Sequence, residues 1–192
     1  MANKIGGKMI LEGSRIYLRN IVESDASTLL KWGRNSYYHK TAGFAQYETL
    51  NQARDAVLNY QERPNSFAIS LKGNTQMIGL IELYERGTDH SSGLLKTKEV
   101  GFLLDQDFEG HGYMTEALKL IFDYAFKDLK QSEIWAGTSE DNQKSQKLLE
   151  KMGFKYKYEV DYRYIPPFFD FQEKYYLLKS EQWNTIVTNA KS

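Results

Sequence analysis

Residues 98–117 read KEVGFLLDQDFEGHGYMTEA, and they are the most informative part of the sequence. The apolar run around Val100 is typical of a strand, Gly110 and Gly112 of a tight turn, and the residues from Tyr113 of an amphipathic helix. The first amides of a helix have no partner inside it, and the helix dipole adds partial positive charge there. Glycine lets the backbone close around an anion and adopt positive φ. The pattern therefore predicts a strand, a phosphate-binding turn and a helix.

Composition limits the classes of protein that this chain can belong to. The chain has 192 residues, no cysteine, and 25 basic and 25 acidic residues. The length predicts a single domain, 1–192, that buries its own core. The zero net charge and the absence of an apolar run of ~20 residues predict no nucleic-acid partner and no membrane partner. Without cysteine, and with three scattered histidines, we expect no disulfide and no metal site in a soluble, unprocessed, cytoplasmic protein.

Further strands and helices are expected around the central stretch. Thr49 and Gln52 have the form of a capping box, so a helix should run from there to about Glu62. Residues 34–48 show no clean period and are expected to form a loop, and residues 86–97 a long hairpin loop. The other expected elements are strands at 15–19, 66–71, 76–84, 134–136, 155–163 and 171–178, and helices from Ser24 and from Asn142.

A second motif lies downstream, where Asn142 and Ser145 precede the Gly-Phe pair at 153–154 by the length of one helix. With EVGFLL at 99–104 and GHGYMTEA at 110–117, the order of motifs resembles the GNAT superfamily of N-acetyltransferases. Within it, the chain resembles the branch of the ribosomal-protein-alanine and spermidine N-acetyltransferases over nearly its whole length. The resemblance implies an α+β fold, with a mainly antiparallel mixed sheet splayed at the cofactor site and flanked by helices. It also implies acetyl-CoA as donor and an amine as acceptor.

The resemblance further implies which residues hold the coenzyme. The turn and helix start would bind the pyrophosphate, the strand end would pair with the pantetheine arm, and Asn142 would contact that arm. The residues concerned are Gly110, His111, Gly112, Tyr113, Met114 and Thr115 for the pyrophosphate, Phe102, Leu103 and Leu104 for the arm, and Ser145 near the sulfur. A helix cap is the alternative for Asn142, and an exposed turn histidine for His111. The family often has Gln or Arg at the position of Asp107, so we expect this carboxylate to face solvent.

Amine acetylation needs a base, because alkyl amines titrate near ~10 and the nucleophile must be neutral. Glu99 and Glu82 are the candidate bases, since each lies on a strand face with apolar neighbours where burial would raise its pKa. A solvated strand glutamate is the alternative for both. A backbone N–H near Leu104 would stabilise the oxyanion. Many family members have a tyrosine acid where this chain has Leu149, so Ser145 is the candidate acid, or else a small residue packed at the helix start.

We therefore expect an N-acetyltransferase that moves the acetyl group of acetyl-CoA to a primary amine by direct attack. The acceptor would be a protein N-terminus, a polyamine or a small molecule, and a homodimer is a possible assembly. For a polyamine, the carboxylates to consider are Glu82, Glu85, Asp89 and Glu99. Aromatic residues that would line the acceptor site, or pack in the core, are Tyr158, Tyr162, Tyr164, Phe168 and Phe169. The alternative function is a non-catalytic acyl-CoA-binding or regulatory module with the same fold, suggested by the missing tyrosine.

Overall fold

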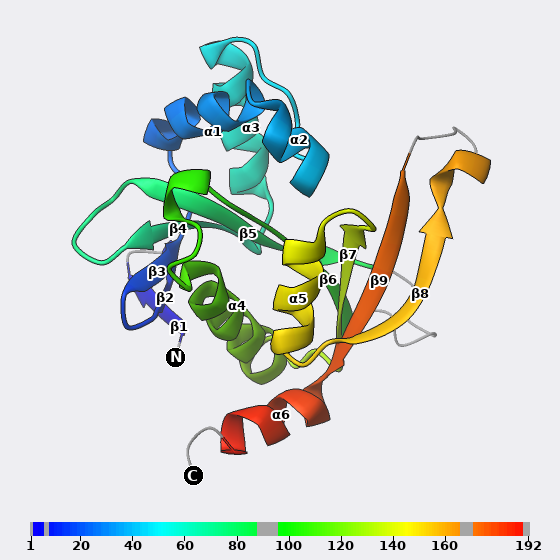
Figure 1. The fold of residues 1–192 in the computed structure, drawn as a ribbon. Coiled ribbons are helices and arrows are strands. Elements are labelled where there is room, and N and C mark those ends of the chain that lie inside the picture. The colour runs from blue at the N-terminus through cyan, green and yellow to red at the C-terminus, as the bar shows by residue number, and fades with distance from the viewer. Residues whose placement is uncertain (1, 6–7, 88–95, 166–170, 190–192) are drawn as a thin grey trace. The chain divides into compact units, whose positions relative to one another are not determined.

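The computed structural model describes residues 2–5, 8–87, 96–165 and 171–189, and Figure 1 shows its ribbon. Asp89, Phe168 and Phe169, named above as candidates, lie outside the described residues, as does most of the expected hairpin loop. The chain groups into two compact units, and β5 and β6 each contribute residues to both. The expectation of a single domain stays a prediction.

The first unit, Met1–Leu83 with Phe102–Tyr124, is built on antiparallel strands. They are β1 (Ala2–Ile5), β2 (Lys8–Glu12), β3 (Ile16–Arg19), β4 (Ser66–Leu71) and β5 (Met77–Glu85), and they pair in this order. The helices are α1 (Ala26–Gly33), α2 (Ser36–Ala42), α3 (Leu50–Glu62) and α4 (Tyr113–Asp123). Short 3-10 turns lie at Glu23–Asp25 and Gln106–Phe108.

Strand β4 is buried on both faces because helices of the first unit cover each of them. Ala68 belongs to a core cluster with residues of α1, α2 and α3, among them Trp32 and Tyr38. The ring of Phe67 instead contacts that of Tyr124, directly after α4, at a centroid distance of 6.1 Å. Neighbouring strand residues point to opposite faces. Helices α1–α3 therefore cover one face and α4 the other, as Figure 1 shows.

The second unit, Tyr84–Gly101 with Ala125–Ser192, has a mixed sheet. Its strands are β6 (Thr97–Leu104), β7 (Glu133–Ser139), β9 (Gln172–Lys179) and β8 (Lys155–Asp161), in this order. Its helices are α5 (Gln143–Lys151) and α6 (Ser180–Asn189), with a π-helical turn at Tyr124–Asp128 and a 3-10 turn at Tyr162–Tyr164. Every second residue of β7 is buried, so Ile134 and Ala136 face the core with Leu149 of α5, while Trp135 lies on the other face.

The pairing of β6 with β7 is short. These strands run parallel and are joined only over Thr97–Glu99 and Glu133–Trp135. Beyond Trp135, β7 continues to Ser139 and pairs there with β9. All other pairings described within a unit are antiparallel, which confirms the expected α+β fold with a mainly antiparallel mixed sheet and flanking helices. The early end of the β6–β7 ladder is the feature expected of a splayed sheet.

Two local expectations have different outcomes. The capping box is confirmed, since Gln52 N donates to Thr49 Oγ1 at 3.3 Å and Thr49 N donates to Gln52 Oε1 at 3.0 Å. The expectation of a loop over 34–48 is wrong in part, because α2 lies inside it. Asn35 accepts a hydrogen bond from Tyr37 N at its start, and Gly43 ends it with φ 60°. A helix of seven residues with mixed polar and aromatic side chains shows too little periodicity to be detected.

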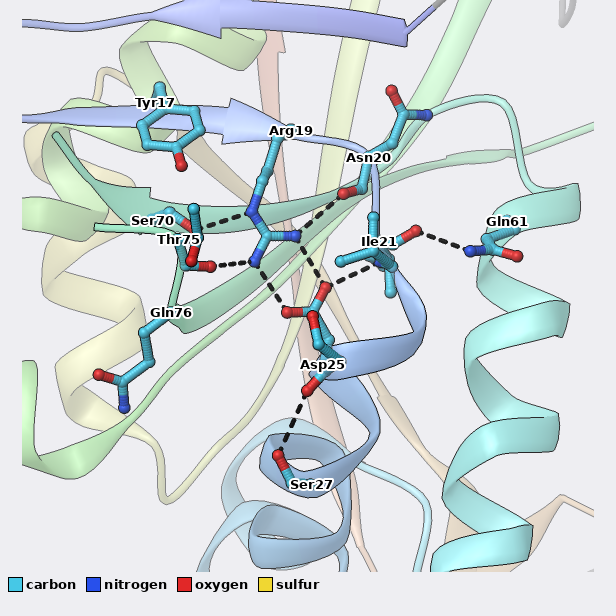
Figure 2. A network of polar contacts seen from close by, with 12 residues as sticks. Tyr17, Arg19, Asn20, Ile21, Asp25, Ser27, Gln61, Ser70, Thr75 and Gln76 are labelled. Atoms are coloured by element: carbon cyan, nitrogen blue, oxygen red, sulfur yellow. Dashed lines mark hydrogen bonds and ion pairs between the residues drawn. The ribbon is translucent and has the colours of Figure 1, made fainter. Parts of the chain in front are cut away.

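A buried ion pair joins the sheet of the first unit to its first helices (Figure 2). Both guanidinium Nη atoms of Arg19 on β3 lie 2.8 Å from the carboxylate oxygens of Asp25. The side chains are only 12% and 4% exposed. Arg19 also donates to Ser70 Oγ at 3.0 Å and to Thr75 O at 2.6 Å, and Asp25 accepts from Val22 N at 2.9 Å. Each charge is therefore compensated by its partner and by further hydrogen bonds.

We predict that Asp25→Asn destabilises the protein strongly, because the Arg19 guanidinium would remain buried without its counter-charge. The free energy of unfolding in urea should fall by roughly 3–5 kcal/mol. The matched control is Glu23→Gln, which removes an exposed pair with Arg54 at 3.8 Å and should change stability by less than about 1 kcal/mol. Equal effects of the two substitutions would contradict this account of the network.

Candidate functional site

The glycine turn of the first unit has the conformation that the sequence predicts. Gly110 and Gly112 both have φ 78°, and Gly112 caps α4 without a side chain. A Cβ at Gly110 would meet nothing within 4 Å, and one at Gly112 would meet only Arg15 Nη2, at 3.5 Å. The first bond of the helix runs from Glu116 N to Gly112 O, so the amides before Glu116 precede the helical ladder. The turn is open and presents backbone donors.

Arg15 and Glu116 lie beside this turn and were not predicted as site residues. Arg15 Nη1 donates to His111 O at 2.9 Å, and its guanidinium carbon lies 5.0 Å from the centre of the Tyr113 ring. Glu116 holds Arg15 through the backbone N–H at 2.8 Å and through Nε at 3.0 Å. Burial alone would raise the pKa of Glu116, but the hydrogen bonds from Arg15 and Ser14 outweigh it and the pKa lies below its ordinary value. The carboxylate of Glu116 is therefore charged near neutral pH, and the guanidinium that it holds adds positive charge at the turn.

The other polar groups of the turn are engaged with the protein. His111 is exposed, its Nδ1 lies 2.8 Å from Glu109 O, and its ring stacks on that of Tyr113 at a centroid distance of 5.6 Å. His111 is thus exposed in the turn, as one of the two alternatives has it, whereas its contact with a phosphate stays a prediction. Asp107 is 75% exposed and pairs with Lys31 at 3.1 Å, which confirms that its carboxylate faces solvent. Lys31 also pairs with Asp105, and these two hydrogen bonds raise its pKa to about 12.

The end of β6 packs closely against β5. Leu103 is buried in the core of the first unit, while Phe102 and Leu104 are half-buried. Asp105 N donates to Ile78 O at 2.8 Å. A Cβ at Gly79 would lie 2.8 Å from Leu103 O, so this glycine is what lets the two strands approach. Met114 is buried and Tyr113 and Thr115 are half-buried, so Met114 offers a ligand its backbone rather than its side chain.

In the second unit, Glu99 has the environment of a candidate base. Its carboxylate is 29% exposed and pairs with Arg86 Nη1 at 2.9 Å. Burial raises the pKa of Glu99 above its ordinary value, the charge of Arg86 opposes this rise, and the charge of Glu173 adds to it. The sequence predicts this partial burial on an apolar strand face, but it does not predict the ion pair with Arg86.

Glu82, the other candidate base, lies in the first unit with a different environment. It is only 3% exposed, so the alternative of a solvated strand glutamate is wrong for it. Its Oε1 accepts hydrogen bonds from Ser66 Oγ at 2.5 Å and from Arg63 Nη1 at 3.1 Å. Ser66 is its register partner on β4. The carboxylate is bound to β4 and to the end of α3, which is the environment of a structural residue.

The start of α5 combines Asn142 and Ser145. Asn142 is the N-cap, and its Oδ1 accepts a hydrogen bond from Ser145 N at 3.1 Å. The cap, the second of the two alternatives, is therefore shown, whereas coenzyme contact by Asn142 stays a prediction. Ser145 is half-buried. Leu149, in the position of the family's tyrosine, is fully buried.

Comparisons with known proteins agree with this arrangement. Residues 15–155 match the acetyltransferase (GNAT) domain family. The probable N-acetyltransferase YjcK of Bacillus subtilis is 32% identical over 154 residues, which cover 76% of this chain and 83% of that protein. Two crystal structures have similar folds at 21% identity. An acetyltransferase of the GNAT family from Bacillus anthracis has a TM-score of 0.77 and covers 90% of this chain and 99% of its own. The ribosomal-protein-S5-alanine acetyltransferase of Vibrio fischeri has a TM-score of 0.70, with 91% and 98% covered.

The chain belongs to the GNAT family of acetyltransferases. This confirms the resemblance drawn from the motifs, and it makes the protein an acetyl-CoA-dependent acetyltransferase by class. Within the described parts of the chain, none of the helices combines the length and the apolar character needed to cross a membrane. Nor do the described residues bring three His, Cys, Asp or Glu side chains together as metal ligands. The cytoplasmic location and a homodimeric assembly stay predictions.

Proposed function

We propose that this enzyme acetylates a primary amine by direct attack on acetyl-CoA, whose diphosphate is held at the glycine turn. The main support for this proposal is the conformation and openness of the glycine turn. Gly110 and Gly112 adopt the left-handed conformation, which side chains disfavour, and the space above Gly110 is open. The amides of Tyr113, Met114 and Thr115 head α4, where the dipole favours an anion. Arg15 adds a full positive charge within reach of the same turn.

The pantetheine arm would pair with the free edge of β6. The β6–β7 ladder ends at Glu99, so the residues after it have no described partner on β7. An extended arm with amide groups can use such an edge as if it were another strand. A backbone N–H near Leu104 would then donate to the thioester oxygen as negative charge develops, because main-chain donors are already oriented.

The chemical step is a transfer of the acetyl group from sulfur to nitrogen. The amine nitrogen attacks the carbonyl carbon, a C–N bond forms, and the C–S bond breaks. Glu99, directly or through water, takes the proton that the amine loses, and a raised pKa makes it a better base. The thiolate of coenzyme A leaves, and the hydroxyl of Ser145 is the candidate donor to it. Because a thiol has a pKa of ~8.5, the thiolate needs little help from an acid to leave.

Thiol release from acetyl-CoA tests the function directly. We expect turnover with at least one member of a panel that contains an alkylamine, a polyamine and a peptide with a free N-terminus. Binding of acetyl-CoA is measured in parallel by calorimetry. Tight binding without thiol release for any amine would favour the non-catalytic acyl-CoA-binding module.

We predict that Gly112→Ala weakens the binding of acetyl-CoA by at least about tenfold, the equivalent of about 1.4 kcal/mol. The added Cβ strains a backbone at positive φ and occupies space that the diphosphate needs. Gly73→Ala is the matched control, since Gly73 has φ 80° with nothing within 4 Å of its Cβ position and lies in the turn between β4 and β5. Both variants should lose similar stability. Unchanged affinity of the Gly112 variant in calorimetry would remove the diphosphate from this turn.

We predict that Glu99→Gln lowers kcat by roughly 10²–10⁴-fold and leaves acetyl-CoA affinity unchanged, because the base is lost but the coenzyme contacts remain. In the wild type, kcat should fall as the pH falls through the raised pKa of Glu99, since the protonated carboxyl cannot accept a proton. This limb should be absent in the variant. The control is Glu181→Gln on α6, an exposed carboxylate in the same unit. A retained acidic limb in Glu99→Gln would assign the proton acceptor elsewhere.

A further inference from the structure

The guanidinium of Arg86 is held by aromatic rings and a carboxylate on one sheet face of the second unit. Its Cζ lies 4.3 Å from the centre of the Trp135 ring and 5.4 Å from that of Tyr175. Its Nη1 donates to Glu99 at 2.9 Å and its Nη2 to Tyr158 Oη at 2.8 Å. We call these five residues the Arg86 cluster. They come from β6, β7, β8 and β9 and the residue that follows β5, so the cluster is assembled by the sheet.

The cluster lies on the face of β7 opposite its core residues. Trp135 alternates with the buried Ile134 and Ala136, and it is the register partner of Glu99. Gly137, the next residue on this face, has no side chain, and a Cβ there would lie 2.6 Å from Glu173 Oε1. The carboxylate of Glu173 therefore fills the space above Gly137. This face brings aromatic rings and acidic groups together.

The carboxylates on this face outnumber the cations in contact with them among the described residues. Glu99 and Glu173 are two carboxylates, and Arg86 is the one cation shown in contact with the cluster among the described residues. Tyr175 Oη donates to Glu173 Oε2 at 2.7 Å and lies 2.8 Å from Tyr162 Oη. Burial and the bonds to Tyr162 and Glu173 raise the pKa of Tyr175, so it stays neutral and does not compete for a cation.

Aromatic faces beside a carboxylate are the chemistry that binds an ammonium group. In the structure, the guanidinium of Arg86 makes these ring and carboxylate contacts. It also covers one oxygen of Glu99, the group proposed to accept a proton from the amine. An alkylammonium that took the place of the guanidinium would keep the ring contacts and would bring its nitrogen to Glu99. The guanidinium of Arg86 and an alkylammonium would thus compete for the same aromatic rings and the same carboxylate.

We infer that the Arg86 cluster, with Glu173, is a binding site for a cationic alkylamine acceptor. The side chain of Arg86 occupies this site in the absence of the amine, and the amine displaces it. The inference rests on the proposed function, and it narrows the acceptor. An amine with a carboxylate close to it is disfavoured, because that group would meet Glu99 and Glu173. An alkylammonium without a neighbouring negative charge fits.

The test uses tetramethylammonium, which binds as a cation but cannot be acetylated, and follows Trp fluorescence without acetyl-CoA. A saturable change is expected in the wild type, and about tenfold tighter binding in Arg86→Ala, since the competing guanidinium is gone. Arg86→Lys, which restores a cation, should return the affinity toward that of the wild type. Trp135→Phe should remove the signal, because Trp32 and Trp183 are buried elsewhere. Far-UV circular dichroism checks that each variant is folded.

Several results would overturn the inference. They are an Arg86→Ala variant that binds no tighter, a response that sodium chloride reproduces at equal ionic strength, or a signal that survives in Trp135→Phe. Faster acetylation of a peptide N-terminus than of butylamine, without competition from tetramethylammonium, would also do so. These failures differ from that of the proposed function. Thiol release without cation binding at the cluster keeps the acetyltransferase proposal, whereas cation binding without thiol release keeps the site and rejects that proposal.

Discussion

The carboxylate of Glu116 is the group on which the glycine turn depends. It accepts hydrogen bonds from Ser14 Oγ at 3.0 Å and from Arg15 N at 2.8 Å, and it pairs with Arg15 Nε at 3.0 Å. A Cβ at Gly13 would collide with this carboxylate, so only a glycine there lets Glu116 reach Ser14 and Arg15. Its place in the first turn of α4 is also favourable, because the helix dipole stabilises negative charge there. One side chain thus fixes the turn between β2 and β3, the first turn of α4 and the orientation of an arginine.

This arrangement resolves an apparent contradiction in the turn. The family resemblance implies Gln or Arg at the position of Asp107, and a carboxylate there would weaken the attraction for a diphosphate. Asp107 is turned to solvent and neutralised by Lys31, while Arg15 supplies a guanidinium from another element. The positive charge at the turn therefore comes from Arg15, just before β3, rather than from the segment before the glycines. A chain can keep a site's electrostatics while moving the residue that provides it.

The sequence predicts features whose cause is local and misses those whose cause is distant. The capping box at Thr49 and the positive φ of Gly110 follow from neighbouring residues, and both could be predicted. The partners Arg15 and Glu116 are separated by 101 positions, and Arg86 and Tyr158 by 72, so no local pattern brings them together. Asn142 shows a third case. Its role as a helix cap follows from the local sequence, whereas a coenzyme contact is implied only by the family resemblance.

Two opposing effects act on Glu99, so its environment alone does not define a catalytic role. Burial raises its pKa and so favours it as a base, but an ion pair with Arg86 lowers the pKa and covers one oxygen. With the arginine in place, the carboxylate is half-buried and paired, which is also the state of many structural glutamates. An amine that displaces the arginine replaces one positive charge with another while burial stays, and it exposes the oxygen of Glu99 that Arg86 bonds. A cation that is exchanged rather than lost keeps the rings and the carboxylate compensated throughout, and the base would become free only in the presence of its substrate.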